Sequence, residues 1–182
     1  MKKLYFVRHG QTDTNIGGLL SGHIEAILTE DGKAQAIAAG KKLKEEHQRI
    51  DLIVCSPLKR AYETACLIAK EIEYPIENIV QNALFKERSF GVLEGTSSEK
   101  FFKTGGYKDI DSVKGAETVA SLQKRASDAL EYIKTLPYEN ILIVGHGASG
   151  RALRRVVNGE PHTNEYLGEL KMINNSEILE LF

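Results

Sequence analysis

Cysteine is scarce in this sequence, and long apolar runs are absent. The two cysteines, Cys55 and Cys66, are too few for a disulfide framework and fit a reducing compartment. No stretch approaches the roughly 18 apolar residues that a membrane-spanning helix requires. The short apolar segment 4–7 near the N-terminus is also too small for a signal-peptide core. We therefore expect a cytoplasmic protein that has no membrane partner.

An excess of one charge is missing as well. Lys and Arg number 24 and Asp and Glu number 25, for a formal net charge of -1, so the chain has no general attraction for nucleic acid. Any anion must therefore be bound by a local cluster of cations. The sequence also has no compact group of His, Cys and Asp at metal-ligand spacing, so we expect no metal. No sequence pattern predicts an oligomeric state.

The remaining composition is that of an ordinary globular protein. Hydrophobic residues make up 42% and charged residues 27%, and 182 residues suit one domain. Short apolar runs alternate with amphipathic stretches along the chain. The runs predict strands at 4–7, 52–55, 76–80, 140–144 and 177–181, and the amphipathic stretches predict helices at 29–47, 57–73, 117–136 and 149–157.

Alternating strands and helices predict an α/β fold, in which helices cover both faces of a mostly parallel sheet. Within a single domain of residues 1–182, the glycine-rich segment 84–116 interrupts this alternation. We interpret it as an active-site insertion with a short helix at 99–103. We expect the helix at 57–73 to have Ser56 as its N-cap and Pro57 as its first residue.

Three predicted strands end in residues that suit phosphate binding: Arg8-His9-Gly10, the segment from Cys55 to Arg60, and Gly145-His146-Gly147. Ligands of parallel sheets bind beyond the carboxyl ends of the strands, so we expect these residues to converge on one pocket. Guanidinium groups match phosphate oxygens in pairs, and a helix that begins at Pro57 would add backbone N–H donors. The sequence therefore predicts a phosphate site.

A neutral histidine in such a pocket is a competent nucleophile, because its ordinary pKa lies near ~6.5. Neighbouring arginines disfavour its protonation and neutralise the incoming phosphoryl group. A second histidine, if protonated, can donate to the oxygens of the transferred group. A carboxylic acid must then protonate the departing alkoxide, and the candidates are Glu87, Glu94 and Glu117.

These residues resemble the signature of the histidine phosphatase superfamily, which includes the cofactor-dependent phosphoglycerate mutases. The resemblance covers nearly the whole chain. It rests on five ordered blocks: Arg8-His9-Gly10-Gln11-Thr12 with Asn15 and Ser21-Gly22; Ser56-Pro57-Leu58-Lys59-Arg60-Ala61; Glu87, Phe90-Gly91 and Glu94-Gly95; Gly115, Glu117 and Arg125; and Val144-Gly145-His146-Gly147 with Arg151. It implies a three-layer αβα sandwich on a mostly parallel sheet, and neither a metal nor an organic cofactor.

The resemblance also implies a role for each matching residue. His9 would be the phosphohistidine, and Arg8, Arg60 and His146 would complete the phosphate pocket. Glu87 would be the proton donor and later the base that activates water. The substrate site would be lined by Gly10, Thr12, Asn15, Ser21, Gly22 and Gly147.

The sequence departs from the family pattern in three places. Ile27 stands where proline is common, and Ala148 stands where glycine or asparagine is common. Segment 99–114 is short and lacks the basic pair and the long insertion with which mutases hold the substrate carboxylate. This last difference favours a phosphatase that acts on small phosphorylated metabolites.

Three other interpretations stay open. A mutase would have to protect its phosphohistidine from water. A binding module would keep the pocket without catalysis, although His9, Glu87 and His146 are all present. A cysteine-based phosphatase would use Cys55 with Arg60, but the segment between them is shorter than in that class and contains a proline and no glycine.

Overall fold

The computed structural model describes residues 2–103, 106–160 and 172–182 of the chain. Its sheet contains the strands β1 (Lys3–Arg8), β2 (Leu52–Cys55), β3 (Val80–Gln81), β4 (Asn140–Gly145) and β5 (Ile178–Glu180). The strand order is β3-β2-β4-β1-β5, and β5 alone runs antiparallel to its neighbour. The mostly parallel sheet predicted from the sequence is therefore confirmed.

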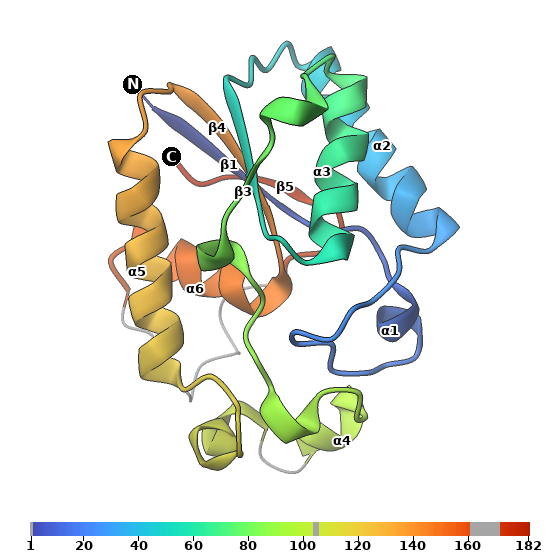
Figure 1. The fold of residues 1–182 in the computed structure, drawn as a ribbon, viewed down its shortest axis with the longest axis vertical. Helices are drawn as coiled ribbons and strands as arrows, with labels where there is room; N and C mark the ends of the chain where they lie inside the picture. Colours follow the sequence, from blue (N-terminus) through green and yellow to red (C-terminus); the bar gives the residue numbers. More distant parts are fainter. Residues whose placement is uncertain (1, 104–105, 161–171) are drawn as a thin grey trace.

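Helices cover both faces of this sheet (Figure 1). The α-helices of the described residues are α1 (Asp13–Ile16), α2 (Glu30–Glu45), α3 (Lys59–Glu71), α4 (Ser98–Lys103), α5 (Val119–Thr135) and α6 (Gly147–Val157). The pair α2 and α3 packs on one face, and the pair α5 and α6 packs on the other. Within the described part of the chain, no helix combines the length and the apolar character needed to cross a bilayer.

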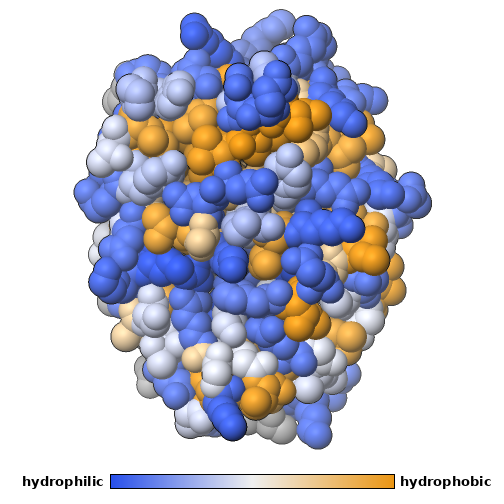
Figure 2. All heavy atoms as spheres, viewed as in Figure 1, coloured by the Kyte–Doolittle hydropathy of each residue, from blue (hydrophilic) through white to orange (hydrophobic). Residues whose placement is uncertain are grey.

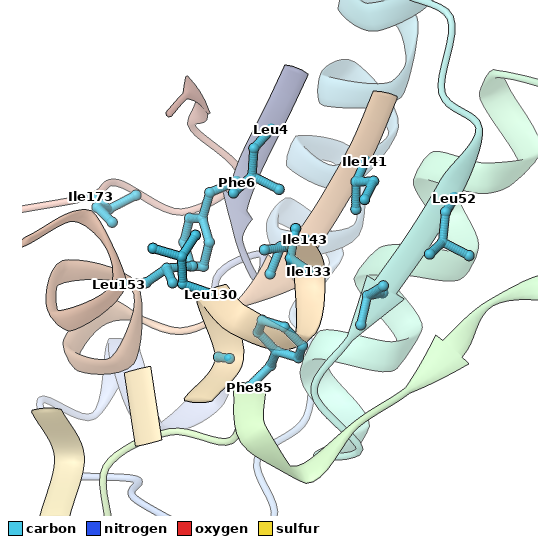
Figure 3. Packing of buried hydrophobic residues seen from close by; sticks show 12 residues of the cluster. Leu4, Phe6, Leu52, Phe85, Leu130, Ile133, Ile141, Ile143, Leu153 and Ile173 are labelled. Atoms are coloured by element: carbon cyan, nitrogen blue, oxygen red, sulfur yellow. The ribbon is translucent and has the colours of Figure 1, made fainter. Parts of the chain in front are cut away.

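Side-chain alternation along the strands builds a separate core on each face of the sheet. Leu4 and Phe6 of β1 point toward α5 and α6, whereas Tyr5 and Val7 point toward α2 and α3. Figure 3 shows the first of these cores, where Phe6 lies among residues of β4, α5 and α6. Each side chain of this size stabilises the fold by about 1.5–3 kcal/mol when it is fully buried.

Two predicted elements differ from the structure. Helix α3 begins at Lys59 and not at Pro57, and no side chain caps it. Ser56 does not cap the helix, because its hydroxyl accepts the N–H of Leu58 in a local turn (3.2 Å). The strand expected at 76–80 is largely the 3-10 turn η1 (Ile76–Asn78), which places Ile76 and Ile79 on one face, against the core beside α3.

The segment 84–116 forms short turns around a small core of its own. It contains α4 and the 3-10 turns η3 (Gly91–Leu93) and η4 (Gly106–Ser112), while η2 (Ala83–Phe85) leads into it. The small core consists of Phe90, Phe101 and Ile110 from this segment, with Leu20 and Val119 from outside it. Gly91 has a positive φ of 56°, and a side chain there would collide with the carbonyl of Lys114. In Figure 1 this segment lies beyond the carboxyl ends of the parallel strands.

The face of the molecule that Figures 1 and 2 show carries both hydrophobic and hydrophilic atoms. Figure 2 shows a band of hydrophobic atoms across its upper half, over the region where Figure 1 draws the edge of the sheet between α5 and α3. The edge strand β3 is only two residues long, so it offers little free backbone to another strand. The lower half, over segment 84–116, carries polar and apolar atoms side by side.

Candidate active site

The paired strands β1 and β4 place the two histidines of the motifs side by side. Arg8 lies opposite Gly145 in the register, and the N–H of His9 donates to the carbonyl of Gly145 (2.9 Å). The ring centroids of His9 and His146 are 5.1 Å apart. Both rings are buried. The convergence of these strand ends follows directly from the parallel pairing that the sequence predicts.

Local backbone geometry determines the tautomer of His9. Its Nδ1 lies 2.7 Å from the carbonyl oxygen of Gly10, and a carbonyl oxygen only accepts, so Nδ1 must carry the proton. Burial lowers the pKa of His9 well below its ordinary value, and the neighbouring His146, Arg60 and Arg8 lower it further. The ring is therefore neutral, and the lone pair on Nε2 is available for attack.

Arg8 and Arg60 bring two guanidinium groups to this ring. Arg60 is fully buried, and it donates to the carbonyls of Gly22 (2.7 Å) and Ile24 (3.0 Å). Arg8 donates to the carbonyl of Ile173 (2.9 Å). Both arginines thus hold backbone that surrounds the site and also line its cavity. An anion here would meet cations from two different elements.

Backbone donors reach the site from a different helix than the sequence indicated. The N–H of Lys59, at the start of α3, donates to the carboxylate of Glu25 (3.3 Å). The expectation of free donors at Pro57 is therefore wrong, because α3 begins later and its first turn faces an acidic side chain. The donors that do reach the site belong to α6, which begins directly after His146.

Glu87 lies at the N-terminus of α6. One oxygen accepts the N–H of Ser149 (2.9 Å) and that of Arg88 (2.8 Å), and the other accepts the N–H of Ala148 (3.2 Å). Burial by itself raises the pKa of Glu87, but these three bonds and the charge of Arg60 outweigh it and lower the pKa below its ordinary value. Glu87 therefore rests as a carboxylate.

The two other candidate acids are not part of the described lining of the cavity. Glu94 accepts from the N–H of Phe90 (3.0 Å) and from the hydroxyl of Ser89 (3.1 Å), inside segment 84–116. Glu117 forms a 2.6 Å ion pair with Arg125. Of the three carboxylates, Glu87 is the one that lines the cavity.

His146 is fully buried. Burial lowers its pKa well below the ordinary value, and the charges of Arg60 and Arg8 add to the effect. The ring of His146 is therefore neutral in the resting site. Within the described part of the chain, neither ring nitrogen has a hydrogen-bond partner. A neutral ring can still donate one hydrogen bond and accept one.

The cavity has a volume of about 180 Å³, and segment 84–116 contributes Glu87, Phe90, Ser98 and Phe102 to its wall. Its described lining comprises Arg8, His9, Asn15, Gly18, Leu19, Leu20, Ser21, Gly22, Arg60, Glu87, Phe90, Ser98, Phe102, Gly147, Ala148, Arg151 and Met172. The charged groups of the strand ends form its inner part. Its outer part carries three apolar side chains that are partly open to solvent: Leu19, Phe102 and Met172, which are 37%, 50% and 53% exposed.

The residues expected to line the substrate site divide into two groups. Asn15, Ser21, Gly22 and Gly147 line the cavity. Gly10 and Thr12 are buried behind it, outside the lining that the described residues provide. A side chain at Gly10 would come within 2.2 Å of a backbone oxygen of α2, and Thr12 caps α1, so both support the site from the protein side.

Cys55 has the environment of a core residue. It is fully buried between the sheet and α3, and burial raises the pKa of its thiol to about 12. A thiol with this pKa is not a nucleophile near neutral pH. The structure therefore gives no support to the cysteine-based alternative.

One contact to the nucleophile had almost no signal in the sequence. Asn175, just before β5, donates from Nδ2 to the carbonyl of His9 (2.8 Å) and toward Oδ1 of Asn15 (3.3 Å). The N–H of the next residue, Ser176, donates to the carbonyl of Arg8 (2.9 Å). The end of the chain thus holds the backbone of the Arg8-His9 pair.

Comparison with known proteins identifies a family for this arrangement. Residues 4–178 match the histidine phosphatase superfamily (branch 1). The 2,3-bisphosphoglycerate-dependent phosphoglycerate mutase of Bartonella bacilliformis is 32% identical over 180 residues, which cover 93% of this chain and 87% of that protein. The "Uncharacterized phosphatase PhoE" of Bacillus subtilis is 35% identical over 160 residues, which cover 87% of this chain and 79% of that protein.

A solved structure shows the same fold. Bacillus stearothermophilus YhfR superimposes with a TM-score of 0.82 at 25% identity, over 98% of this chain and 89% of that one. Relatives named as mutases and as phosphatases thus have similar identity to this chain.

Proposed function

The chain belongs to branch 1 of the histidine phosphatase superfamily, and on that premise we propose that it is a metal-independent phosphatase of small phosphomonoesters. The observation that carries the proposal is the state of His9, a neutral ring whose Nδ1–H bond to Gly10 leaves Nε2 unprotonated. Arg8 and Arg60 line the same cavity and supply the charge that a phosphoryl group needs.

In the first step, Nε2 of His9 attacks phosphorus, and the bond from phosphorus to the alcohol oxygen breaks. The guanidinium groups of Arg8 and Arg60 and the ring N–H of His146 bind the non-bridging oxygens. Nδ1 keeps its proton, which remains hydrogen-bonded to the carbonyl of Gly10 while positive charge develops on the ring. The alkoxide that departs takes a proton, which leaves a neutral alcohol and phosphohistidine.

Glu87 handles that proton, although it rests as a carboxylate. A phosphate ester beside it is a second negative charge, which raises the pKa of a neighbouring carboxyl. The ester also brings a proton of its own, because the second pKa of a phosphomonoester lies near ~6. Glu87 accepts this proton from the bound monoanion and passes it to the leaving oxygen.

In the second step, water attacks the phosphohistidine on the side opposite to Nε2. The N–P bond breaks, and its electron pair returns to Nε2. Glu87, again a carboxylate, takes the proton of the water and gives it to the departing phosphate. The histidine and the carboxylate return to their starting states.

The outer part of the cavity supports hydrolysis over mutase chemistry. A mutase has to hold an acidic alcohol and keep water away from the phosphohistidine. Among the described lining residues of the outer wall, the apolar side chains of Leu19, Phe102 and Met172 are partly open to solvent. Nη1 of Arg151 lies 2.8 Å from Sδ of Met172. Such a wall favours an alcohol with apolar surface and leaves a path for water. A mutase is the alternative, because the Bartonella relative is named as one.

The test compares wild type with His9→Ala on 4-nitrophenyl phosphate, with a chelator present. His47→Asn is the matched control, because His47 is exposed on the far end of α2. We expect metal-independent hydrolysis that His9→Ala abolishes and the control retains. Parallel reactions with 3-phosphoglycerate, with and without its bisphosphorylated primer, detect mutase activity. Isomerisation without phosphate release would contradict the proposal, and binding of phosphate without turnover would point to a binding module.

A further inference from the structure

Arg125 and Glu117 form an ion pair with two parallel hydrogen bonds near the loop that carries Glu87. Nε of Arg125 lies 2.7 Å from Oε1 of Glu117, and Nη2 lies 2.6 Å from Oε2. Both side chains are largely buried, with exposed fractions of 18% and 13%. Fork-to-fork pairing of this kind fixes the orientation of the guanidinium plane as well as its position.

The remaining donors of Arg125 point at one short stretch of backbone. Nη1 donates to the carbonyls of Leu84 and Lys86, both at 2.8 Å, and Nη2 donates to the carbonyl of Glu87 (3.4 Å). A guanidinium has five N–H donors, and here each one has an acceptor. Glu117 therefore orients the side chain, and the other donors bind the segment that leads into Glu87.

Glu117 also holds the other side of Glu87. Its carbonyl accepts from Nε of Arg88 (2.9 Å), and its N–H donates to the carbonyl of Ser89 (2.9 Å). The pair therefore binds the backbone before Glu87 through Arg125 and the residues after it through Glu117. The carbonyl of Glu87 also lies 2.7 Å from Nε2 of His23, and its carboxylate extends to the N-terminus of α6.

We propose that Arg125, with Glu117 as its counter-ion, is a positioning residue for the acid–base step. It fixes the carbonyls around Glu87, and so sets where the Glu87 carboxylate meets the leaving oxygen and the attacking water. Neither member of the pair belongs to the described lining of the cavity, and the donors of Arg125 and both carboxylate oxygens of Glu117 are already engaged by protein atoms, so the pair acts through Glu87. The inference rests on the proposed function, because it assumes that Glu87 moves the proton.

The chemistry of the leaving group separates positioning from simple stabilisation. An alkyl phosphate needs its leaving oxygen protonated, whereas a 4-nitrophenolate leaves without a proton. A small misplacement of the catalytic carboxylate costs about 10- to 100-fold in rate. We therefore expect Arg125→Ala to lower kcat on glycerol 2-phosphate by about 10- to 100-fold more than on 4-nitrophenyl phosphate, with KM little changed.

Two further variants define the role of the pair. Arg125→Lys keeps the charge but cannot bind three carbonyls and a carboxylate at once, so it should show the same selective loss to a smaller degree. Glu117→Gln keeps the shape of the side chain and removes the charge that pairs with Arg125, and it carries the same comparison of the two substrates. Lys124→Ala is the control, since Lys124 is exposed on the same helix and pairs with Asp128. Lys124→Ala should leave kcat on both substrates unchanged.

The outcomes distinguish the inference from the proposed function. If Glu87→Gln shows the selective loss, and folded Arg125 variants lower kcat equally on both substrates, the positioning role is wrong. If Glu87→Gln itself lowers both equally, the acid assignment fails instead, and the inference fails with it. Thermal unfolding of each variant shows which are folded at the assay temperature. Should Arg125→Ala not fold, Arg125→Lys and Glu117→Gln carry the same comparison.

Discussion

Nδ1 of His9 lies 2.7 Å from the carbonyl oxygen of Gly10, the residue that follows it in the chain. The nucleophile is thus held in one tautomer by its own backbone, and no separate carboxylate is needed to orient it. The carbonyl of His9 itself is held from the other end of the chain, by Asn175. Nε2 is left as the reactive atom, and the predictions below concern the groups of the site around it.

The first prediction concerns activity at acid pH. His9 must be neutral to attack, and burial together with its charged neighbours places its pKa well below the ordinary value. Protonation therefore removes little of the nucleophile between pH 7 and 5.5. We expect kcat/KM on 4-nitrophenyl phosphate, measured as a pH–rate profile, not to fall over that range, because protonation of the ester near pH ~6 produces the monoanion that binds and does not remove it. A loss of about tenfold per pH unit starting near ~6.5 would mean that His9 titrates as an ordinary histidine.

The second prediction concerns stability. The pKa values of His9 and His146 are lowered in the folded protein, so below about pH 6.5 the unfolded chain binds protons that the folded chain does not. The free energy of unfolding should be constant between about pH 6.5 and 8, below the range in which an unfolded thiol titrates, and fall as the pH drops from 6.5 toward 5.5. The limiting slope is about 1.4 kcal/mol per pH unit for each histidine. The lowered pKa of Glu87 acts at lower pH and does not contribute there.

Urea unfolding across that range measures the effect, in a buffer without phosphate. His146→Asn should reduce the slope by about half, because one of the two depressed histidines is gone. A slope that His146→Asn leaves unchanged would show that other groups cause it.

The third prediction concerns Arg60, whose guanidinium is buried and holds the carbonyls of Gly22 and Ile24. Arg60→Ala removes a phosphate-binding cation and releases this loop at the same time. We expect kcat/KM to fall by on the order of 10²–10³-fold, as for the loss of a transition-state donor. Calorimetric titration with inorganic phosphate should show weaker binding. Arg60→Lys should recover only part of it, since an ammonium cannot reach both carbonyls and the anion. Unchanged phosphate affinity in Arg60→Ala would contradict the pocket.

Sequence patterns predicted the parts of this site that depend on strand ends. Apolar runs located β1 and β4, and parallel pairing was enough to bring His9 and His146 together. The start of α3 was misplaced, because a serine-proline pair looks like a helix start even where the chain makes a further turn first. Glu117 and Arg125 belong to one block of the family resemblance, but no local sequence pattern indicates which segment they bind. Their partners lie around Glu87, and only the folded chain brings those segments together.

The fourth prediction concerns the outer wall of the cavity. Phe102 is half exposed there, and Phe101 beside it anchors α4 in the small core of segment 84–116. Phe102→Ser should therefore change substrate preference more than folding. Apolar contact contributes about 25 cal/mol per Å² removed from water. We expect kcat/KM on 1-naphthyl phosphate to fall several-fold, with little change on glycerol 2-phosphate. Equal effects on both esters would show that the alcohol does not rest against this wall.

The last prediction concerns Asn175, which donates to the carbonyl of the nucleophile from the far end of the chain. Asn175→Asp has nearly the same shape but replaces the donor with a negative acceptor that faces a carbonyl oxygen. The lost bond, with an acceptor left unpaired, costs about 1–3 kcal/mol. We expect lower stability together with a fall in kcat on both aryl and alkyl esters, because the nucleophile and not the acid is displaced.

Asn174→Ala is the control in the same segment. The Asn174 side chain is exposed and donates from Nδ2 to Glu177 (3.0 Å), and alanine removes this bond without placing a second carboxylate beside Glu177. Rapid-quench measurement of phosphohistidine formation would show whether the first step is the one that slows in Asn175→Asp. If stability falls while that step keeps its wild-type rate, Asn175 merely fastens the C-terminal segment. If the first step slows and the control does not, the end of the chain sets the position of the nucleophile.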